Sequence, residues 1–168
     1  MQNSYLELYA KQIYEIYNLK ENRKIGIISN YLEFKIEYLS RIINIDKYNY
    51  DIIKKEQSKG YFMKWHFDNA KIIKHKPELI NNYIDENNIK ISNKHILHYY
   101  IKKPIYTLII YESDYDVDFT GGTLEFIDGT IIKPKKGLYV LFDSNELHKV
   151  NIMTSGKRIN YLIKFYEK

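Results

Sequence analysis

Two histidines and one aspartate are the side chains best suited to bind a metal ion. His66 and Asp68 stand as His-Phe-Asp at the end of Tyr61 to His66, a segment with the composition of a β-strand. Side chains two residues apart on a strand point to the same face, so both can reach one ion. His148 lies far downstream, just after a second predicted strand, Leu138 to Phe142. We therefore expect these three residues to be the metal ligands.

Two imidazoles and one carboxylate on one side of an ion leave open positions opposite, as in non-haem Fe(II) oxygenases. Arg158 follows ten residues after His148, opens the last predicted strand, and is one of only three arginines. A guanidinium there could bind a carboxylate through two hydrogen bonds. Taken singly, each residue has an ordinary alternative: a histidine hydrogen-bonded to a neighbouring aspartate, a loop histidine, and an arginine in a surface ion pair.

The composition predicts a single globular domain. The chain has 168 residues, of which 45% are hydrophobic and 28% charged. The absence of cysteine excludes disulfides, thiolate metal sites and cysteine nucleophiles. No apolar run is long enough to cross a bilayer, and the N-terminal segment is amphipathic rather than signal-like, so we expect an intracellular, cytoplasmic protein. The net charge of +5 comes from scattered lysines, which favours a solvated surface over a nucleic-acid patch.

Two supporting helices are predicted within residues 1–46, each from apolar residues three and four positions apart. The stripe of the first is Leu6, Tyr9, Ile13 and Tyr17, and Gly26 falls in the break after it. The second begins at Asn30, with Glu33 in an N-terminal capping arrangement. Its stripe is Leu32, Ile36, Leu39 and Ile43.

Residues 47–168 predict a β-sandwich or jelly roll, because short strand-like segments alternate with turn signals. The predicted strands are Tyr61–His66, Tyr106–Glu112, Thr123–Phe126, Leu138–Phe142 and Arg158–Tyr166. The turn signals are Gly121-Gly122, Asp128-Gly129, Pro134 to Gly137 and Ser155-Gly156. An insertion at about 69–103 is long for a connection, which often marks a functional lid, and Pro77 to Glu86 within it could form a short helix.

From about residue 50 to residue 168 the chain resembles the prolyl 4-hydroxylase-like branch of the 2-oxoglutarate- and Fe(II)-dependent dioxygenases. The segment Tyr-Phe-Met-Lys-Trp-His66-Phe-Asp68 is similar to the first metal-binding strand of that branch. Further matches follow in the order of the family. They are Tyr106-Thr-Leu-Ile-Ile-Tyr111, Gly121-Gly122-Thr-Leu-Glu-Phe126, Lys133-Pro134-Lys-Lys-Gly137, Phe142, His148 and Gly156-Lys-Arg158.

The resemblance implies a mostly β fold, a double-stranded β-helix, with iron bound by His66, Asp68 and His148. It implies that 2-oxoglutarate chelates the iron and that its distal carboxylate meets Arg158. Tyr111 matches a tyrosine that helps to hold this carboxylate in some members, although it could equally be a core aromatic. Asn160 lies two residues after Arg158 on the same strand face and could add a hydrogen bond.

The chain departs from the family pattern at two places. Many members have a 2-oxoglutarate-binding tyrosine nine or ten residues before the first histidine, where this chain has Glu56 and Gln57. The insertion is longer than in compact members. It contains His95 and His98, which we interpret as ordinary histidines, because a spacing of three places them on opposite faces of a strand and no further ligands accompany them.

The resemblance implies an enzyme that uses Fe(II), 2-oxoglutarate and O2 to hydroxylate a peptide or protein side chain, releasing succinate and CO2. One alternative is a nucleic-acid demethylase of the same superfamily. The terminal motif of those demethylases is faintly similar to Arg158, Asn160 and Lys164 of this chain. Another is a non-catalytic jelly-roll binding module, against which the intact triad argues. The substrate and the oligomeric state do not follow from the sequence.

Overall fold

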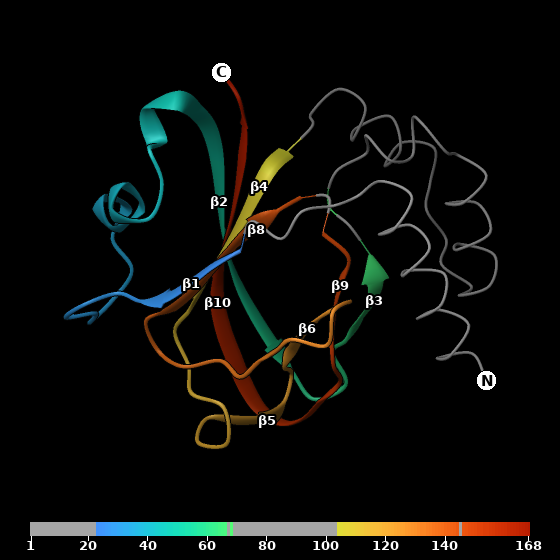
Figure 1. Ribbon diagram of the computed structural model, residues 1–168. Helices are drawn as coiled ribbons and strands as arrows, with labels where there is room; N and C mark the ends of the chain where they lie inside the picture. The colour runs from blue at the N-terminus through green and yellow to red at the C-terminus, as the bar shows by residue number, and fades with distance from the viewer. Residues whose placement is uncertain (1–22, 67, 69–103, 145) are drawn as a thin grey trace, which may run out of the picture.

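Two antiparallel β-sheets make up most of the described chain (Figure 1). The structure is a computed structural model and describes residues 23–66, 68, 104–144 and 146–168. The larger sheet has the order β1-β8-β4-β10-β2, with β5 also paired to β10. Its strands are β1 (Lys24–Ile27), β2 (Tyr48–Ser58), β4 (Pro104–Tyr111), β5 (Phe119–Gly121), β8 (Leu138–Asp143) and β10 (Met153–Glu167). The smaller sheet, β3-β9-β6-β7, contains β3 (Met63–His66), β6 (Leu124–Phe126), β7 (Ile131–Ile132) and β9 (His148–Val150).

Apolar side chains from both sheets meet between them and form one core. Phe126 of the smaller sheet packs edge-on against Phe142 of the larger sheet, with 5.2 Å between ring centroids. The buried members of this core are Tyr111, Leu124, Phe126, Ile132, Val140, Phe142 and Val150. The sheets are therefore the two layers of a sandwich, as the sequence predicts.

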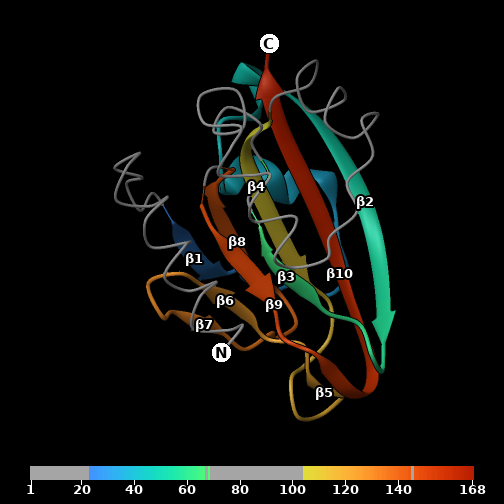
Figure 2. The same ribbon diagram turned by 90° about the vertical axis from the view of Figure 1, so that its right-hand side faces the viewer.

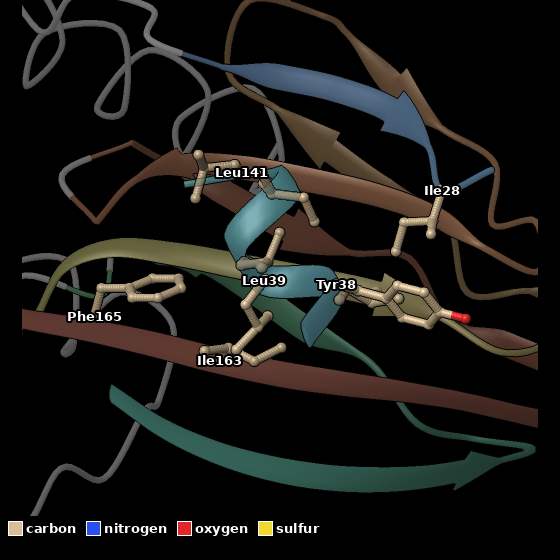
Figure 3. Close-up of a cluster of buried hydrophobic side chains, with 9 residues drawn as sticks. Ile28, Tyr38, Leu39, Leu141, Ile163 and Phe165 are labelled. Carbon is tan, nitrogen blue, oxygen red and sulfur yellow. The ribbon is translucent and has the colours of Figure 1, made fainter. Parts of the chain in front are cut away.

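A second core lies on the other face of the larger sheet (Figure 3). Two short 3-10 helices, η1 (Ile36–Arg41) and η2 (Ile45–Lys47), lie on that side, whereas β3 lies on the opposite side (Figure 2). The buried residues of this second core are Ile28, Tyr38, Leu39, Ile42, Leu108, Ile110, Leu141, Ile163 and Phe165. The larger sheet is therefore packed with apolar side chains on both faces.

The predicted helix beginning at Asn30 is wrong. Asn30 has a φ of 56°, in the left-handed region, and only Ile36–Arg41 is helical, as a 3-10 helix. Leu39 is fully buried, but Leu32 and Ile36, which the helical stripe places beside it, are 77% and 55% exposed. Gly26, expected in a break, lies within β1.

Contacts to Glu112, at the end of β4, explain why this segment does not form an α-helix. The Tyr31 hydroxyl and the Phe34 backbone N–H both donate hydrogen bonds to the Glu112 carboxylate. These tertiary bonds fix the chain from Tyr31 to Phe34 in an irregular path, so they override the local capping signal at Asn30.

The five predicted strands are all present, with shifted ends. The predicted turn at Ser155-Gly156 is wrong, because both residues lie inside β10, which begins at Met153. Arg158 is consequently inside the last strand and does not open it. The predicted first helix, the Pro77 to Glu86 helix and the pair His95 and His98 lie outside the described residues. Among the described residues, no helix has the length and apolar character needed to span a membrane.

Leu39→Ala should lower the free energy of unfolding by about 2–5 kcal/mol, because it opens a cavity in the second core. Leu32→Ala should change it by less than about 0.5 kcal/mol, since that side chain is 77% exposed. Urea unfolding measures both values. Equal losses in the two variants would contradict the observed path and favour the amphipathic helix.

Candidate active site

The pairing of β3 with β9 brings the predicted metal ligands together. His66, the last residue of β3, is the direct cross-strand partner of His148, the first residue of β9. Asp68 follows two residues after His66 and is 6% exposed. One ligand atom from each of the three residues lies within 4.8 Å of the others. Two segments that are distant in the sequence thus form one cluster.

Hydrogen bonds to the backbone orient both imidazole rings. His66 Nδ1 lies 2.7 Å from the carbonyl oxygen of Lys64, and His148 Nδ1 lies 2.8 Å from that of Glu146. In a neutral ring this leaves Nε2 as the lone-pair atom, and backbone partners of this kind fix metal-binding histidines. His66 Nε2 lies 3.7 Å from Asp68 Oδ1, and His148 Nε2 lies 3.9 Å from Asp68 Oδ2. Both distances are too long for hydrogen bonds and leave room for an ion between the groups.

Asp68 is held in place from the larger sheet. Its Oδ2 accepts a 2.7 Å hydrogen bond from the Thr107 hydroxyl, and its backbone N–H donates to the Ser144 carbonyl oxygen at 2.8 Å. Burial acts to raise the pKa of Asp68, but His148, Lys164 and the other neighbours outweigh burial and lower it. The carboxylate is therefore ionised at neutral pH, as a metal ligand must be.

His148 occupies an aromatic environment between the sheets. Its ring centroid lies 4.8 Å from that of Phe142 and 6.2 Å from that of Phe126. Burial lowers the pKa of His148, and the nearby His66 adds to the decrease. The imidazole is therefore neutral near pH 7 and can donate its lone pair to a cation.

A buried ion pair supports the start of β9. Arg23 Nε lies 2.7 Å from Glu146 Oε1, and the two side chains are 8% and 1% exposed. The Arg23 guanidinium also lies 4.2 Å from the centroid of the Phe126 ring. Phe126 is the cross-strand partner of His148. Because the Glu146 carbonyl accepts the His148 hydrogen bond, this ion pair helps to fix that ligand.

Arg158 lies on the inner face of the larger sheet and is 4% exposed. Its Nε and Nη2 both donate to Gln57 Oε1, at 3.2 and 3.1 Å, and its Nη1 donates to the Gly122 carbonyl oxygen at 2.6 Å. Gly122 has a φ of 67°, and a Cβ there would lie 2.9 Å from the Met153 side chain. The left-handed backbone conformation at Gly122 therefore directs the Gly122 carbonyl toward Arg158.

No carboxylate of the described residues pairs with the Arg158 guanidinium. Its hydrogen-bond acceptors are an amide oxygen and a backbone carbonyl, both neutral. Burial lowers the pKa of Arg158, although an arginine retains its proton in proteins, so the charge remains. A desolvated cation without an anion is costly, so this position favours a negatively charged partner.

Tyr111 and Asn160 are cross-strand partners beside Arg158. Tyr111 is 2% exposed, and burial raises its pKa to about 12, so its hydroxyl is protonated and can donate. Asn160 is 4% exposed, and its Oδ1 atom is buried without a hydrogen-bond partner in the structure. An unsatisfied buried amide costs free energy, which indicates that a ligand or water completes this face.

Sequence reasoning missed several residues that complete the site. The sequence marks position 57 only by the absence of a tyrosine. It gives no role to Tyr61, whose ring centroid lies 5.5 Å from the Arg158 guanidinium. Lys55 pairs with Asn160 across the sheet, and burial lowers its pKa. The available signal was strand alternation, which places Lys55 and Gln57 on the same face of β2.

A family model for the 2OG-Fe(II) oxygenase superfamily, in which 2OG is 2-oxoglutarate, matches residues 49–166. The chain belongs to this superfamily. Its members use Fe(II), 2-oxoglutarate and O2, so the protein is a 2-oxoglutarate-dependent oxygenase with these cofactors. A search of curated proteins found no match.

Two solved prolyl hydroxylases share the fold of this oxygenase. The viral collagen prolyl hydroxylase of Paramecium Bursaria Chlorella virus-1, in complex with 2OG, is 18% identical with a TM-score of 0.53, and the alignment covers 96% of this chain and 90% of that chain. A Pseudomonas putida prolyl-4-hydroxylase is 13% identical with a TM-score of 0.51, covering 97% and 86%. The expected mostly β architecture is thus confirmed, and its antiparallel sheets are consistent with a jelly roll. The second predicted helix is absent from the described residues, and the first lies outside them.

The donor set fits the Fe(II) of the superfamily. It consists of an ionised carboxylate and two imidazoles that present Nε2 toward the same space. This is the ligand combination that non-haem Fe(II) sites use, and it leaves positions for a co-substrate and O2.

Thr107→Val should weaken metal binding by about ten- to a hundredfold, because it removes the hydroxyl that orients Asp68 while keeping the side-chain shape. Titration with Mn(II), followed by electron paramagnetic resonance, measures the affinity. Thr154→Val, at an exposed position of β10, is the matched control and should bind Mn(II) like the wild type. Unchanged affinity in Thr107→Val would remove Thr107 from the metal site.

Proposed function

We propose that this oxygenase hydroxylates a side chain of a peptide or protein and releases succinate and CO2. The observation that carries the proposal is that one sandwich holds both a cluster of three candidate metal ligands and a buried arginine. Among the described residues, no carboxylate pairs with this arginine. A dianionic chelating co-substrate satisfies both features, since one end binds a metal and the other carries a carboxylate. The peptide substrate is inferred from the fold shared with two prolyl hydroxylases.

In this proposal His66, Asp68 and His148 hold the iron. The backbone carbonyls behind the imidazoles and the Thr107 hydroxyl behind the carboxylate keep the three donors in position before the metal arrives. Such preorganisation reduces the rearrangement that binding requires.

Arg158, Tyr111 and Asn160 form the proposed binding surface for the distal carboxylate of 2-oxoglutarate. The guanidinium supplies the charge, and the buried Tyr111 hydroxyl is a second donor. The Asn160 amide is a further polar group, and its Oδ1 atom has no hydrogen-bond partner among the described residues. An anion in this position neutralises the buried cation and exchanges hydration for fixed hydrogen bonds.

When bound, iron and O2 supply the oxidation that couples decarboxylation of 2-oxoglutarate to insertion of oxygen into a C–H bond. The protein residues bind and orient the reactants and exclude water. The buried aromatic rings of Phe126 and Phe142 close the site on the side of His148. This arrangement restricts side reactions of the oxidant with solvent.

Alanine variants of the three proposed ligands should each abolish Fe(II)-dependent succinate formation, because an iron held by two ligands is lost or misplaced. The measurement is succinate released from 2-oxoglutarate in the presence of proline-containing peptides, together with a mass increase of one oxygen on the peptide. Circular dichroism checks that the variants are folded. Full turnover in His66→Ala, Asp68→Ala or His148→Ala would remove that residue from the triad.

Arg158→Ala should weaken 2-oxoglutarate binding by about 2–5 kcal/mol, the range for removing one partner of a buried charge pair. Arg158→Lys should retain part of the affinity, since the charge remains and only the two-point geometry is lost. Calorimetric titration into Mn(II)-loaded protein measures the binding. Arg41→Ala, at an exposed arginine, is the control and should bind normally. Equal affinity in Arg158→Ala and wild type would end this assignment.

A further inference from the structure

Gln57 is the side chain that fixes the direction of the Arg158 guanidinium. The two residues are cross-strand partners in β2 and β10, and they are 7% and 4% exposed. One amide oxygen of Gln57 accepts from both Nε and Nη2 of Arg158, at 3.2 and 3.1 Å. Burial raises the pKa of Tyr61, whereas Arg158 and a hydrogen bond from Gln57 oppose that effect. The side-chain oxygen of Gln57 therefore faces Arg158.

The neutrality of Gln57 has a consequence for the charge of Arg158. An amide oxygen orients a guanidinium but does not neutralise it, whereas a carboxylate in the same place would do both. The other acceptor, the Gly122 carbonyl, is neutral too. The guanidinium is thus held in one orientation with its full charge available to a ligand.

We infer that Gln57 is a positioning residue that makes the site select 2-oxo acids carrying a distal carboxylate. The inference rests on the proposed function of Arg158. A glutamate at position 57 would be an internal anion that competes with the distal carboxylate of the co-substrate. The enzyme would then lose its preference for 2-oxoglutarate over a 2-oxo acid of the same chain length that lacks that carboxylate.

The neighbouring residue provides a matched control. Glu56 lies on the opposite face of β2, where its half-exposed carboxylate is 3.6 Å from the Lys157 ammonium. Exchanging the two residues in the double variant Glu56→Gln, Gln57→Glu keeps the composition and the net charge of the chain. It differs from the wild type only in which face of the strand carries the carboxylate.

The test is calorimetric titration of Mn(II)-loaded protein with 2-oxoglutarate and, separately, with 2-oxopentanoate, which has five carbons and a single carboxylate. Gln57→Glu and the double variant should bind 2-oxoglutarate roughly ten- to a hundredfold more weakly than the wild type, the loss expected when a charge-assisted interaction is given up. Their affinity for 2-oxopentanoate should be unchanged, because that ligand does not need the free guanidinium. Glu56→Gln should bind both ligands like the wild type.

Gln57→Met separates orientation from charge. It removes the acceptor but adds no anion, so it should lose less 2-oxoglutarate affinity than Gln57→Glu. Wild-type affinity for 2-oxoglutarate in Gln57→Glu would overturn the inference, as would an equal loss of both ligands, which indicates a merely structural role. If Arg158→Ala binds 2-oxoglutarate normally, the proposed function of Arg158 fails. If Arg158→Ala is impaired and Gln57→Glu is not, only the inference about Gln57 fails.

Discussion

Arg158 carries a positive charge between two β-sheets, and the described residues that contact its guanidinium orient that charge without neutralising it. Its hydrogen-bond acceptors, Gln57 and the Gly122 carbonyl, are neutral. A buried cation of this kind lowers the stability of the ligand-free protein, and an anion that binds only the folded state restores it. The turn at Gly122 and the pairing of β2 with β10 place the two neutral acceptors beside the guanidinium.

The stability of the fold therefore has to come from other residues. Strand β10 contributes one face to the candidate site and the other face to a hydrophobic core. Arg158 and Asn160 project to the inner face, where the metal-ligand cluster lies, while Ile163 and Phe165 are buried in the core under η1. The strand pairs with β2 from Lys157 to Glu167 and with β4 from Asn160 to Tyr166. A strand anchored on both sides can place polar groups within about half an ångström of a productive geometry, which loops achieve less readily.

The sequence predicts the cluster of His66, Asp68 and His148 and draws attention to Arg158, because the signals of these residues are chemical. His66 and Asp68 stand two residues apart on a strand-like segment, and Arg158 is rare in a lysine-rich chain. The partners of these residues could not be predicted in the same way. Thr107 reaches Asp68, and Gln57 reaches Arg158, only through strand pairing between distant segments.

The helix predicted after Asn30 failed for a related reason. Its capping signal and apolar stripe are local, but Glu112, far along the chain, binds Tyr31 and the Phe34 backbone and imposes another path. The turn predicted at Ser155-Gly156 failed because Gly156, with a φ of 76°, accommodates an irregularity within a long strand instead of ending it. Local patterns were reliable where no distant side chain competed for the same backbone.

The central claim is that one dianion bridges the metal-ligand cluster and Arg158, and thermodynamic linkage tests it most directly. The measurement is calorimetric titration with 2-oxoglutarate and with glutarate, which has both carboxylates but no 2-oxo group, each with and without Mn(II). If a single ligand spans both groups, Mn(II) tightens 2-oxoglutarate binding, 2-oxoglutarate tightens Mn(II) binding by the same factor, and glutarate shows much weaker coupling. Binding of 2-oxoglutarate with the same affinity in the presence and absence of metal would contradict the claim.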